Sequence, residues 1–185
     1  MFKIINTEYM LAFMKISNNF LFTVILIIWF GSAGIAEEKK LEIQNTEMNI
    51  YSGMFDFSDQ KQRAVLIGFQ HQNEELYRDT FLGTLSPITG GFVTENQALY
   101  AYTGVEWNFD LGPINFTPSF APGLYGEGDG KDLGHILEFK SEVQASINFS
   151  ENSSLGMSYN HISNASLGDK NPGANSYMFN FLKKF

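Results

Sequence analysis

The last eleven residues of the chain alternate apolar with small or polar side chains and end on a phenylalanine. In an extended strand, one face of this segment carries Tyr177, Phe179, Phe181 and Phe185, and the other carries Ser176, Asn180 and Lys184. A terminal strand that closes on an aromatic residue, in a chain with a secretory leader, is typical of outer-membrane β-barrels. In such a barrel the apolar face points outward into lipid and not inward toward a core.

The N-terminal 36 residues have the pattern of a signal peptide. An eleven-residue apolar run (20–30, FLFTVILIIWF) follows Lys15 and precedes the small-residue segment GSAGIA, which ends at Ala36. The run is too short for a membrane-spanning helix, which needs about 20 apolar residues. We therefore predict cleavage after Ala36, and Met14 is a better start for a compact leader than Met1.

The predicted mature chain, residues 37–185, is long enough for one domain. Two of the 12 basic residues and one of the 20 acidic residues lie in the leader, so the mature chain has 10 basic and 19 acidic residues and a net charge of −9. This acidic balance argues against nucleic acid as a partner, because phosphate binding needs basic patches. The chain has no cysteine, so it has no disulfide framework and no cysteine metal site.

Period-two patterning recurs along the mature chain and predicts eight strands. They cover residues 49–58, 63–71, 80–94, 99–109, 114–124, 136–149, 153–164 and 175–185. In the first, Tyr51, Phe55 and Phe57 share the face predicted to meet lipid. In the third, Pro87 and Gly90-Gly91 predict a bend or bulge.

The strand over 136–149 carries the clearest alternation and decides the fold class. Glu138, Lys140 and Glu142 lie in a row on one face, and three charges cannot sit in hydrocarbon. They can sit inside a narrow barrel if they pair with each other and with inward partners. We therefore predict an all-β fold, an eight-stranded antiparallel transmembrane barrel whose lumen is filled by side chains. The alternative is a soluble secreted protein with the apolar face inward, either a β-sandwich or a lipocalin-like, lipid-binding barrel.

Polar residues interrupt the lipid-facing side where the seventh predicted strand ends. Tyr159, His161 and Ser163 share the outward parity, and His161 lies about 7 Å along the strand from Ser163. Asn175, at the start of the last strand, has the outward parity of Tyr177. If the first strand rises from the periplasm, all these groups lie near the outer leaflet. Polar groups on a hydrocarbon-facing surface are costly, so they indicate a functional site.

Here the sequence resembles the PagL-type lipid A 3-O-deacylases, in length and strand number and in the motifs HISNA (161–165), NPG (171–173) and, more weakly, EFKSE (138–142). The resemblance implies that His161 is the general base, that Ser163 is the nucleophile and that Asn164 contributes to the oxyanion hole. The implied reaction is metal-free hydrolysis of the ester-linked 3-hydroxyacyl chain at position 3 of lipid A. No cofactor is implied. The implied partners are lipid A or lipopolysaccharide and the outer membrane of a Gram-negative bacterium.

The sequence departs from this family at the third member of the triad. The family has a glutamate shortly after NPG, where this chain has Asn175. An amide can orient an imidazole but cannot stabilise the imidazolium by charge, and replacing the acid by its amide costs a serine protease about 10⁴ in turnover. Asn175 could suffice as orienter, Asp169 could supply the charge, or the protein could be a weak or inactive barrel with a structural or adhesive role. The sequence also leaves homodimer formation open.

Overall fold

The structure is a computed structural model that describes residues 46–73, 76–80 and 83–185. The predicted signal peptide (1–36) lies outside the described residues. No helix among those ranges is long and apolar enough to cross a membrane.

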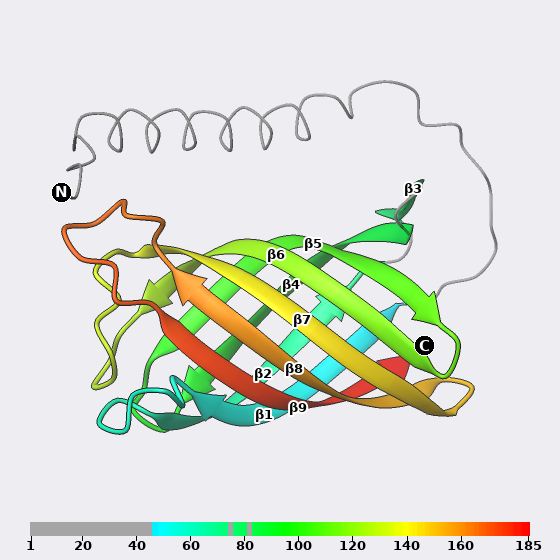
Figure 1. Cartoon of the computed structure of the whole chain (residues 1–185), viewed down its shortest axis with the longest axis horizontal. Coiled ribbons are helices and arrows are strands. Elements are labelled where there is room, and N and C mark those ends of the chain that lie inside the picture. The colour runs from blue at the N-terminus through cyan, green and yellow to red at the C-terminus, as the bar shows by residue number, and fades with distance from the viewer. Residues whose placement is uncertain (1–45, 74–75, 81–82) are drawn as a thin grey trace, which may run out of the picture. The chain divides into compact units, whose positions relative to one another are not determined.

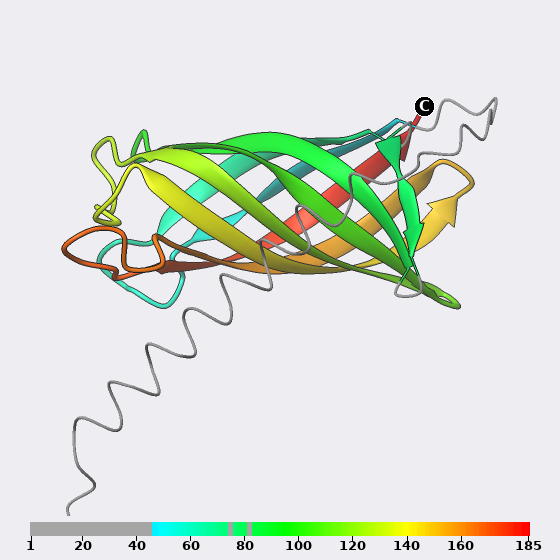
Figure 2. The same cartoon turned by 90° about the horizontal axis from the view of Figure 1, so that it is seen from above.

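The described chain forms one antiparallel sheet that closes on itself (Figures 1 and 2). Its strands are β1 (Glu47–Phe55), β2 (Ala64–Gln72), β3 (Arg78–Thr80), β4 (Gly83–Thr94), β5 (Leu99–Leu111), β6 (Ile114–Gly126), β7 (Leu137–Ser150), β8 (Ser153–Ser163) and β9 (Ala174–Lys184). Two pairings close the ring, β1 with β9 and β2 with β4. Within the described ranges, the short β3 pairs only with the start of β4. The predicted eight-stranded barrel is therefore confirmed, with β3 as a small addition.

Apolar side chains on the outside and polar side chains in the lumen explain why these segments form barrel strands. On β2, Val65, Ile67 and Phe69 are 48%, 58% and 42% exposed on the lipid-facing side. Buried amides and hydroxyls fill the lumen and bond to one another: Asn49 Nδ2 donates to Asn180 Oδ1 at 3.0 Å and to Gln144 Oε1 at 3.2 Å. The alternation predicted for the strands from β5 onward is confirmed by this burial pattern.

The predicted orientation of β1 is wrong. Tyr51 and Phe55 point into the lumen, with 5% and 1% exposure, and Ile50 faces outward at 56%. Tyr51 Oη donates to Gly91 O at 3.0 Å, and the Phe55 ring packs 5.6 Å from that of Phe92. The loop end of the lumen is filled by such aromatic side chains. Aromatic residues on β1 consequently do not mark the lipid-facing side.

Of the bend or bulge predicted in β4, the bulge is absent, because the pairing of β4 with β5 keeps one register from Thr84 to Val93. Pro87 is tolerated because β2, on that side of β4, ends at Gln72. The N–H and C=O of one strand residue point to the same neighbour, and Pro87 O accepts a bond from Asn73 N at 3.1 Å, just past that end. The missing N–H of Pro87 therefore removes only the return bond to Asn73, at the point where β2 has already ended.

The charged row on β7 is buried in the lumen, as predicted, but its pairing is incomplete. Lys140 Nζ lies 3.4 Å from Glu142 Oε2 and 4.0 Å from the centre of the Tyr102 ring. Glu138 is fully buried, and neither of its carboxylate oxygens has a hydrogen-bond partner within the described part of the chain.

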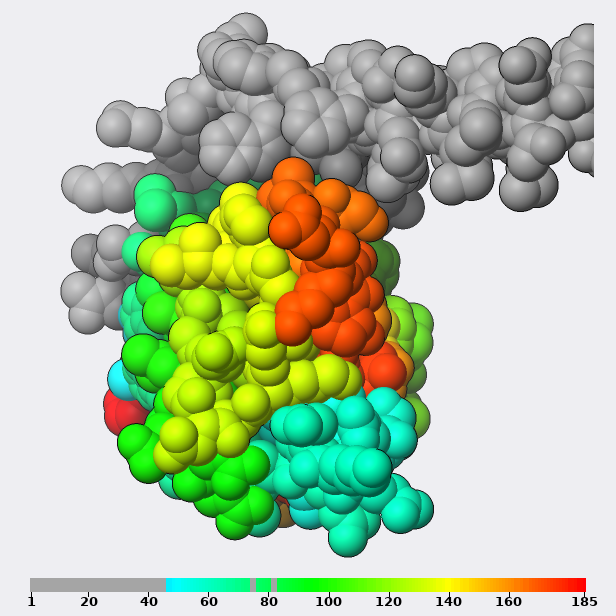
Figure 3. Space-filling view, turned by 90° about the vertical axis from the view of Figure 1, so that its left-hand side faces the viewer, coloured from blue at the N-terminus to red at the C-terminus, as the bar shows by residue number. Residues whose placement is uncertain are grey.

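The two ends of the barrel differ (Figure 1). The turns at 112–113 and 151–152 are tight and lie at the end where the chain terminates. The loops 56–63, 127–136 and 164–173 lie at the opposite end and pack closely together over it (Figure 3). β8 ends and β9 begins at this loop end, where the predicted site residues lie.

Candidate active site

The C-terminal end of β8 carries His161 and Ser163, the two residues predicted to be catalytic, on the outer face of the barrel. His161 is exposed and Ser163 is half-buried, while the alternate residues Asn160 and Ile162 are buried in the lumen. Strict strand alternation produces this arrangement. The structure therefore places both side chains on the lipid-facing side, as predicted.

Asn175 lies directly across the β8–β9 ladder from His161. Directly opposed residues of an antiparallel pair have adjacent side chains on one face. His161 Nδ1 and Asn175 Oδ1 are 2.9 Å apart, a hydrogen-bonding distance. The structure thus joins the imidazole to the amide at the expected position of the triad acid.

Several further groups surround the Asn175 side chain. Tyr159 Oη donates to Asn175 Oδ1 at 2.8 Å, and Asn175 Nδ2 donates to Ser58 Oγ at 3.4 Å. The backbone N–H of Asn175 donates to Asp56 Oδ1 at 3.4 Å. Phe57 N donates to Asn175 O at 2.9 Å. The start of the β1–β2 loop, residues 56–58, is thereby attached to the start of β9.

No hydrogen bond joins Ser163 to His161 among the residues that the structure describes. Catalytic hydrogen bonds are often long in the absence of substrate and tighten only in the complex, so this geometry is compatible with a nucleophile–base pair. Ser163 lies opposite Phe139 of β7 in the ladder.

Gly173, the last residue of the NPG motif, leaves room for the His161 ring. Its φ is +62°, in the left-handed region that favours glycine. A Cβ at this position would lie 2.8 Å from His161 Cε1. The motif is therefore more than a turn before the last strand, because its glycine shapes the space beside the imidazole.

Asn164 is fully buried, and its own hydrogen bonds use all of its donors. Its Nδ2 donates to Leu133 O and to Lys170 O, both at 2.8 Å. Its backbone N–H donates to Asn171 Oδ1 at 3.0 Å. β8 ends one residue earlier, so Asn164 fastens the β8–β9 loop to the β6–β7 loop. An oxyanion at this residue must replace one of the present acceptors.

Short ion pairs connect the loops at this end of the barrel. Lys131 Nζ contacts Asp56 Oδ2 at 2.5 Å and Lys170 Nζ contacts Asp132 Oδ2 at 2.5 Å. The hydrogen bond that Lys170 donates lowers the pKa of the exposed Asp132 carboxyl from its ordinary value of 3.8.

The sequence-based alternative that Asp169 supplies the missing charge gains no contact in the structure. Asp169 is exposed, and no ion pair or hydrogen bond joins it to His161 in the described part of the chain. The acidic residue that hydrogen bonds do connect to Asn175 is Asp56. Sequence reasoning missed Asp56, Ser58 and Tyr159, although the outward parity of Tyr159 placed it beside His161.

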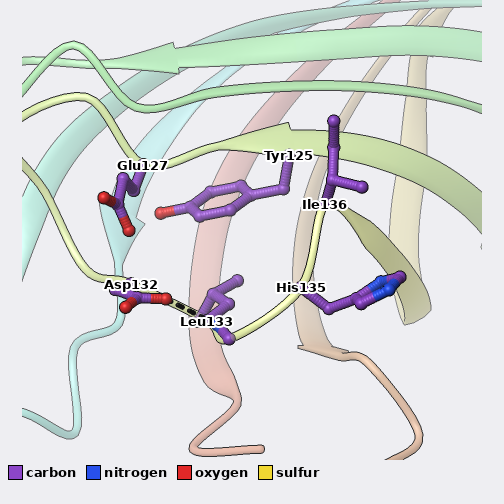
Figure 4. A pocket seen from close by; sticks show the side chains of 7 residues that line it. Tyr125, Glu127, Asp132, Leu133, His135 and Ile136 are labelled. Atoms are coloured by element: carbon purple, nitrogen blue, oxygen red, sulfur yellow. Dashed lines mark hydrogen bonds between the residues drawn. The ribbon is translucent and has the colours of Figure 1, made fainter. Parts of the chain in front are cut away.

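A pocket of about 290 Å³ lies between the end of β6 and the β6–β7 loop (Figure 4). It is lined by Tyr125, Glu127, Asp132, Leu133, Gly134, His135 and Ile136. None of the predicted site residues lines it. Within the described ranges, no group of three or more His, Cys, Asp or Glu side chains is arranged to hold a metal ion.

The fold and the lipid-facing histidine–asparagine pair define a small transmembrane β-barrel with a polar site on its outer wall. The sequence model of the lipid A 3-O-deacylase (PagL) family matches residues 62–184. This chain therefore belongs to the lipid A 3-O-deacylase (PagL) family. His161, Ser163 and Asn175 lie inside the matched region, whereas Asp56 and Ser58 precede it.

The solved structures agree on the fold. The crystal structure of the outer membrane enzyme PagL matches with a TM-score of 0.56 and 19% identity, covering 74% of this chain and 98% of that one. A de novo designed transmembrane β-barrel matches with a TM-score of 0.50 and 12% identity, covering 79% of this chain and 99% of the design. The sequence matches none of the curated proteins.

Proposed function

We propose that this protein is a serine esterase of the Gram-negative outer membrane that removes the ester-linked 3-O-acyl chain of lipid A. The observation that carries the proposal is the hydrogen bond between His161 Nδ1 and Asn175 Oδ1 on the lipid-facing wall, two residues from Ser163. Family membership supplies the substrate class. Longer loops mark the outer end of such barrels, so the site lies at the level of the outer leaflet, where lipid A resides.

The proposed mechanism follows from the hydrogen-bonding capacity of each group. The Nδ1–H of His161 donates to Asn175, which leaves the lone pair on Nε2 to accept the Ser163 proton. Ser163 Oγ attacks the ester carbonyl carbon, and the sugar hydroxyl leaves with a proton from His161. Water, deprotonated by the same imidazole, then cleaves the acyl-enzyme and releases the 3-hydroxy fatty acid.

Stabilisation of the oxyanion is proposed at Asn164. Its backbone N–H directly follows Ser163 in the chain, and it now donates to the amide oxygen of Asn171 at 3.0 Å. An oxyanion is a stronger acceptor than a neutral amide oxygen, because charge-assisted hydrogen bonds are about twice as strong as neutral ones. The charge that develops in the transition state therefore favours the exchange of Asn171 for the substrate oxygen.

The test is mass spectrometry of lipid A from a Gram-negative host that expresses the protein in its outer membrane. Lipid A should lose the mass of one 3-hydroxyacyl chain, and Ser163→Ala and His161→Ala should each abolish the loss. Ser141→Ala is the matched control, because Ser141 is exposed on the same wall opposite His161 in the β7–β8 ladder. It should retain activity, and its inactivation would make Ser141 the nucleophile instead.

The alternative is a catalytically weak or inactive barrel with a structural or adhesive role. It is favoured by the amide at position 175, which has no charge to offer the imidazolium. Unchanged lipid A from cells in which the wild-type barrel is folded in the outer membrane would support this alternative and contradict the esterase.

A further inference from the structure

The side chain of Asn175 is useful to a catalytic base in only one of its two amide orientations. With Oδ1 toward His161, the imidazole carries its proton on Nδ1, and Nε2 is free to accept a proton. With Nδ2 toward His161, the amide would donate to Nδ1, so the proton would lie on Nε2 and the imidazole could not deprotonate Ser163. A carboxylate, with two equivalent oxygens, does not face this problem.

Two of the three groups around the amide accept either orientation. Tyr159 Oη, 2.8 Å from Asn175 Oδ1, can donate to an oxygen or accept from an amide N–H. His161 Nδ1, at 2.9 Å, can likewise be donor or acceptor according to its tautomer. Neither group can therefore choose between the two orientations of Asn175.

The third group, Ser58, favours one orientation of the amide, because its hydroxyl proton is donated to Asp56. Asp56 is 1% exposed and forms an ion pair with Lys131, so its carboxylate only accepts hydrogen bonds. Ser58 Oγ donates its proton to Asp56 Oδ1 at 3.4 Å. Ser58 then presents only lone pairs to Asn175, and the amide Nδ2 faces it at 3.4 Å. The flipped amide would place two oxygens against each other with no proton between them.

We propose that Asp56 and Ser58 are positioning residues that fix the orientation of the Asn175 amide and thereby the Nδ1–H tautomer of His161. The proposal rests on the proposed function in so far as that tautomer serves Ser163 as a base. The β1–β2 loop would then orient the side chain at position 175, which a carboxylate with two equivalent oxygens would not need. Asp56 also has a φ of +48°, which is uncommon for a residue other than glycine and is consistent with a constrained functional position.

Further contacts hold residues 56–58 in place beside Asn175. The backbone bond from Phe57 N to Asn175 O, at 2.9 Å, holds the loop against the start of β9. The Phe57 ring packs against those of Tyr177 and Tyr159, with centroids 5.4 and 6.2 Å apart. Lys131, from the β6–β7 loop, holds the far side of the Asp56 carboxylate. Ser58 therefore meets the amide from a fixed direction.

The test measures the tautomer of His161 directly, without substrate. Ring ¹⁵N chemical shifts are recorded on the histidine-labelled full chain, folded in detergent micelles, at increasing pH until they no longer change, so that the neutral ring is observed. His161→Gln identifies the resonance. The wild type should show mainly the Nδ1–H form. Ser58→Ala, at an exposed position, should lower the ratio of Nδ1–H to Nε2–H about fivefold, the effect of one ordinary hydrogen bond on an equilibrium.

Two further variants separate positioning from general loosening of the site. Tyr159→Phe removes the closer contact to Asn175 but should leave the ratio unchanged, because that hydroxyl serves both orientations equally. In an Asn175→Asp background, Ser58→Ala should have no effect on the ratio, because a carboxylate has no orientation to lose. If the effect of Ser58→Ala on the ratio depends on whether position 175 is asparagine or aspartate, the two positions are directly coupled.

The outcomes are distinct. A wild type with mainly Nε2–H, or a Ser58→Ala variant with an unchanged ratio, would overturn the proposal. A larger shift in Tyr159→Phe than in Ser58→Ala would also overturn it. If the tautomers behave as expected while lipid A stays intact, the positioning role stands and the proposed esterase function fails.

Discussion

Replacing Asn175 by aspartate restores a carboxylate with almost no change of shape, and the structure sets how much activity should rise. Asn175 Oδ1 already lies 2.9 Å from His161 Nδ1, so a carboxylate oxygen would occupy the same place. In serine proteases the loss of the acid costs about 10⁴ in turnover, partly because the amide selects the wrong tautomer. Here Ser58 and Asp56 orient the amide, so the tautomer is already correct in the wild type.

The remaining gain in turnover then comes only from the carboxylate charge, which stabilises the imidazolium of His161. A hydrogen bond to a charged partner contributes about 1 kcal/mol more than a neutral one. Because 1.36 kcal/mol corresponds to a factor of ten, Asn175→Asp should accelerate turnover roughly fivefold, and not by 10³ or more. The assay is the rate of 3-hydroxy fatty acid release from purified lipid A in detergent, with Asn175→Ala as the control that removes the acceptor and should lower the rate.

Two results would refute this reasoning. A gain of 10³-fold or more would mean that the wild-type amide selects the wrong tautomer, contrary to the contacts of Ser58. An unchanged or lower rate would mean that Asn175 does not stand in the place of the triad acid.

Other predictions follow from the neighbouring contacts. Gly173→Ala should lower activity at least tenfold in the lipid A assay, because it introduces a Cβ 2.8 Å from the His161 ring at a φ of +62°; wild-type activity would contradict the close approach. Asn164→Ala leaves two carbonyls without their donor and should destabilise the barrel by about 2–4 kcal/mol in urea unfolding; a change below ~0.5 kcal/mol would show that water replaces the amide. The Asp132 carboxyl should titrate below 3.8 by NMR, so the stabilisation from its bond to Lys170 is present above the ordinary pKa and is lost as pH falls through the lowered one. Lys170→Met should return that titration toward 3.8, and an unaltered midpoint would assign the shift to another group.

The sequence was sufficient to predict the barrel because strand alternation leaves few alternatives. The charged row at Glu138, Lys140 and Glu142 forces one face of β7 into the lumen, and period-two patterning carries the same orientation to most strands. β1 was misassigned because the loop end of the lumen is itself aromatic, so Tyr51 and Phe55 fit either face. Pro87 suggested a bulge because the sequence does not show where the neighbouring β2 ends.

The same logic applies to the site. Parity alone placed His161, Ser163 and Asn175 on one wall, because all three depend only on local alternation. The contacts of Asp56 and Ser58 with Asn175 join residues 119 and 117 positions apart. They depend on the register with which β1 meets β9, and no local pattern contains that register. The bond from Asn164 Nδ2 to Leu133 O was also beyond reach, since Leu133 lies on the β6–β7 loop.

The pairing of β1 with β9 also determines when the site exists. Asn175 receives its orientation from the opposite terminus of the domain, across the junction where the first and last strands zip together. While that junction is open, Asn175 still lies across the β8–β9 ladder from His161, but Asp56 and Ser58 are not beside it to fix the orientation of its amide. Under the proposed function, the preference for the competent tautomer of His161 would therefore be completed only when the first and last strands have joined.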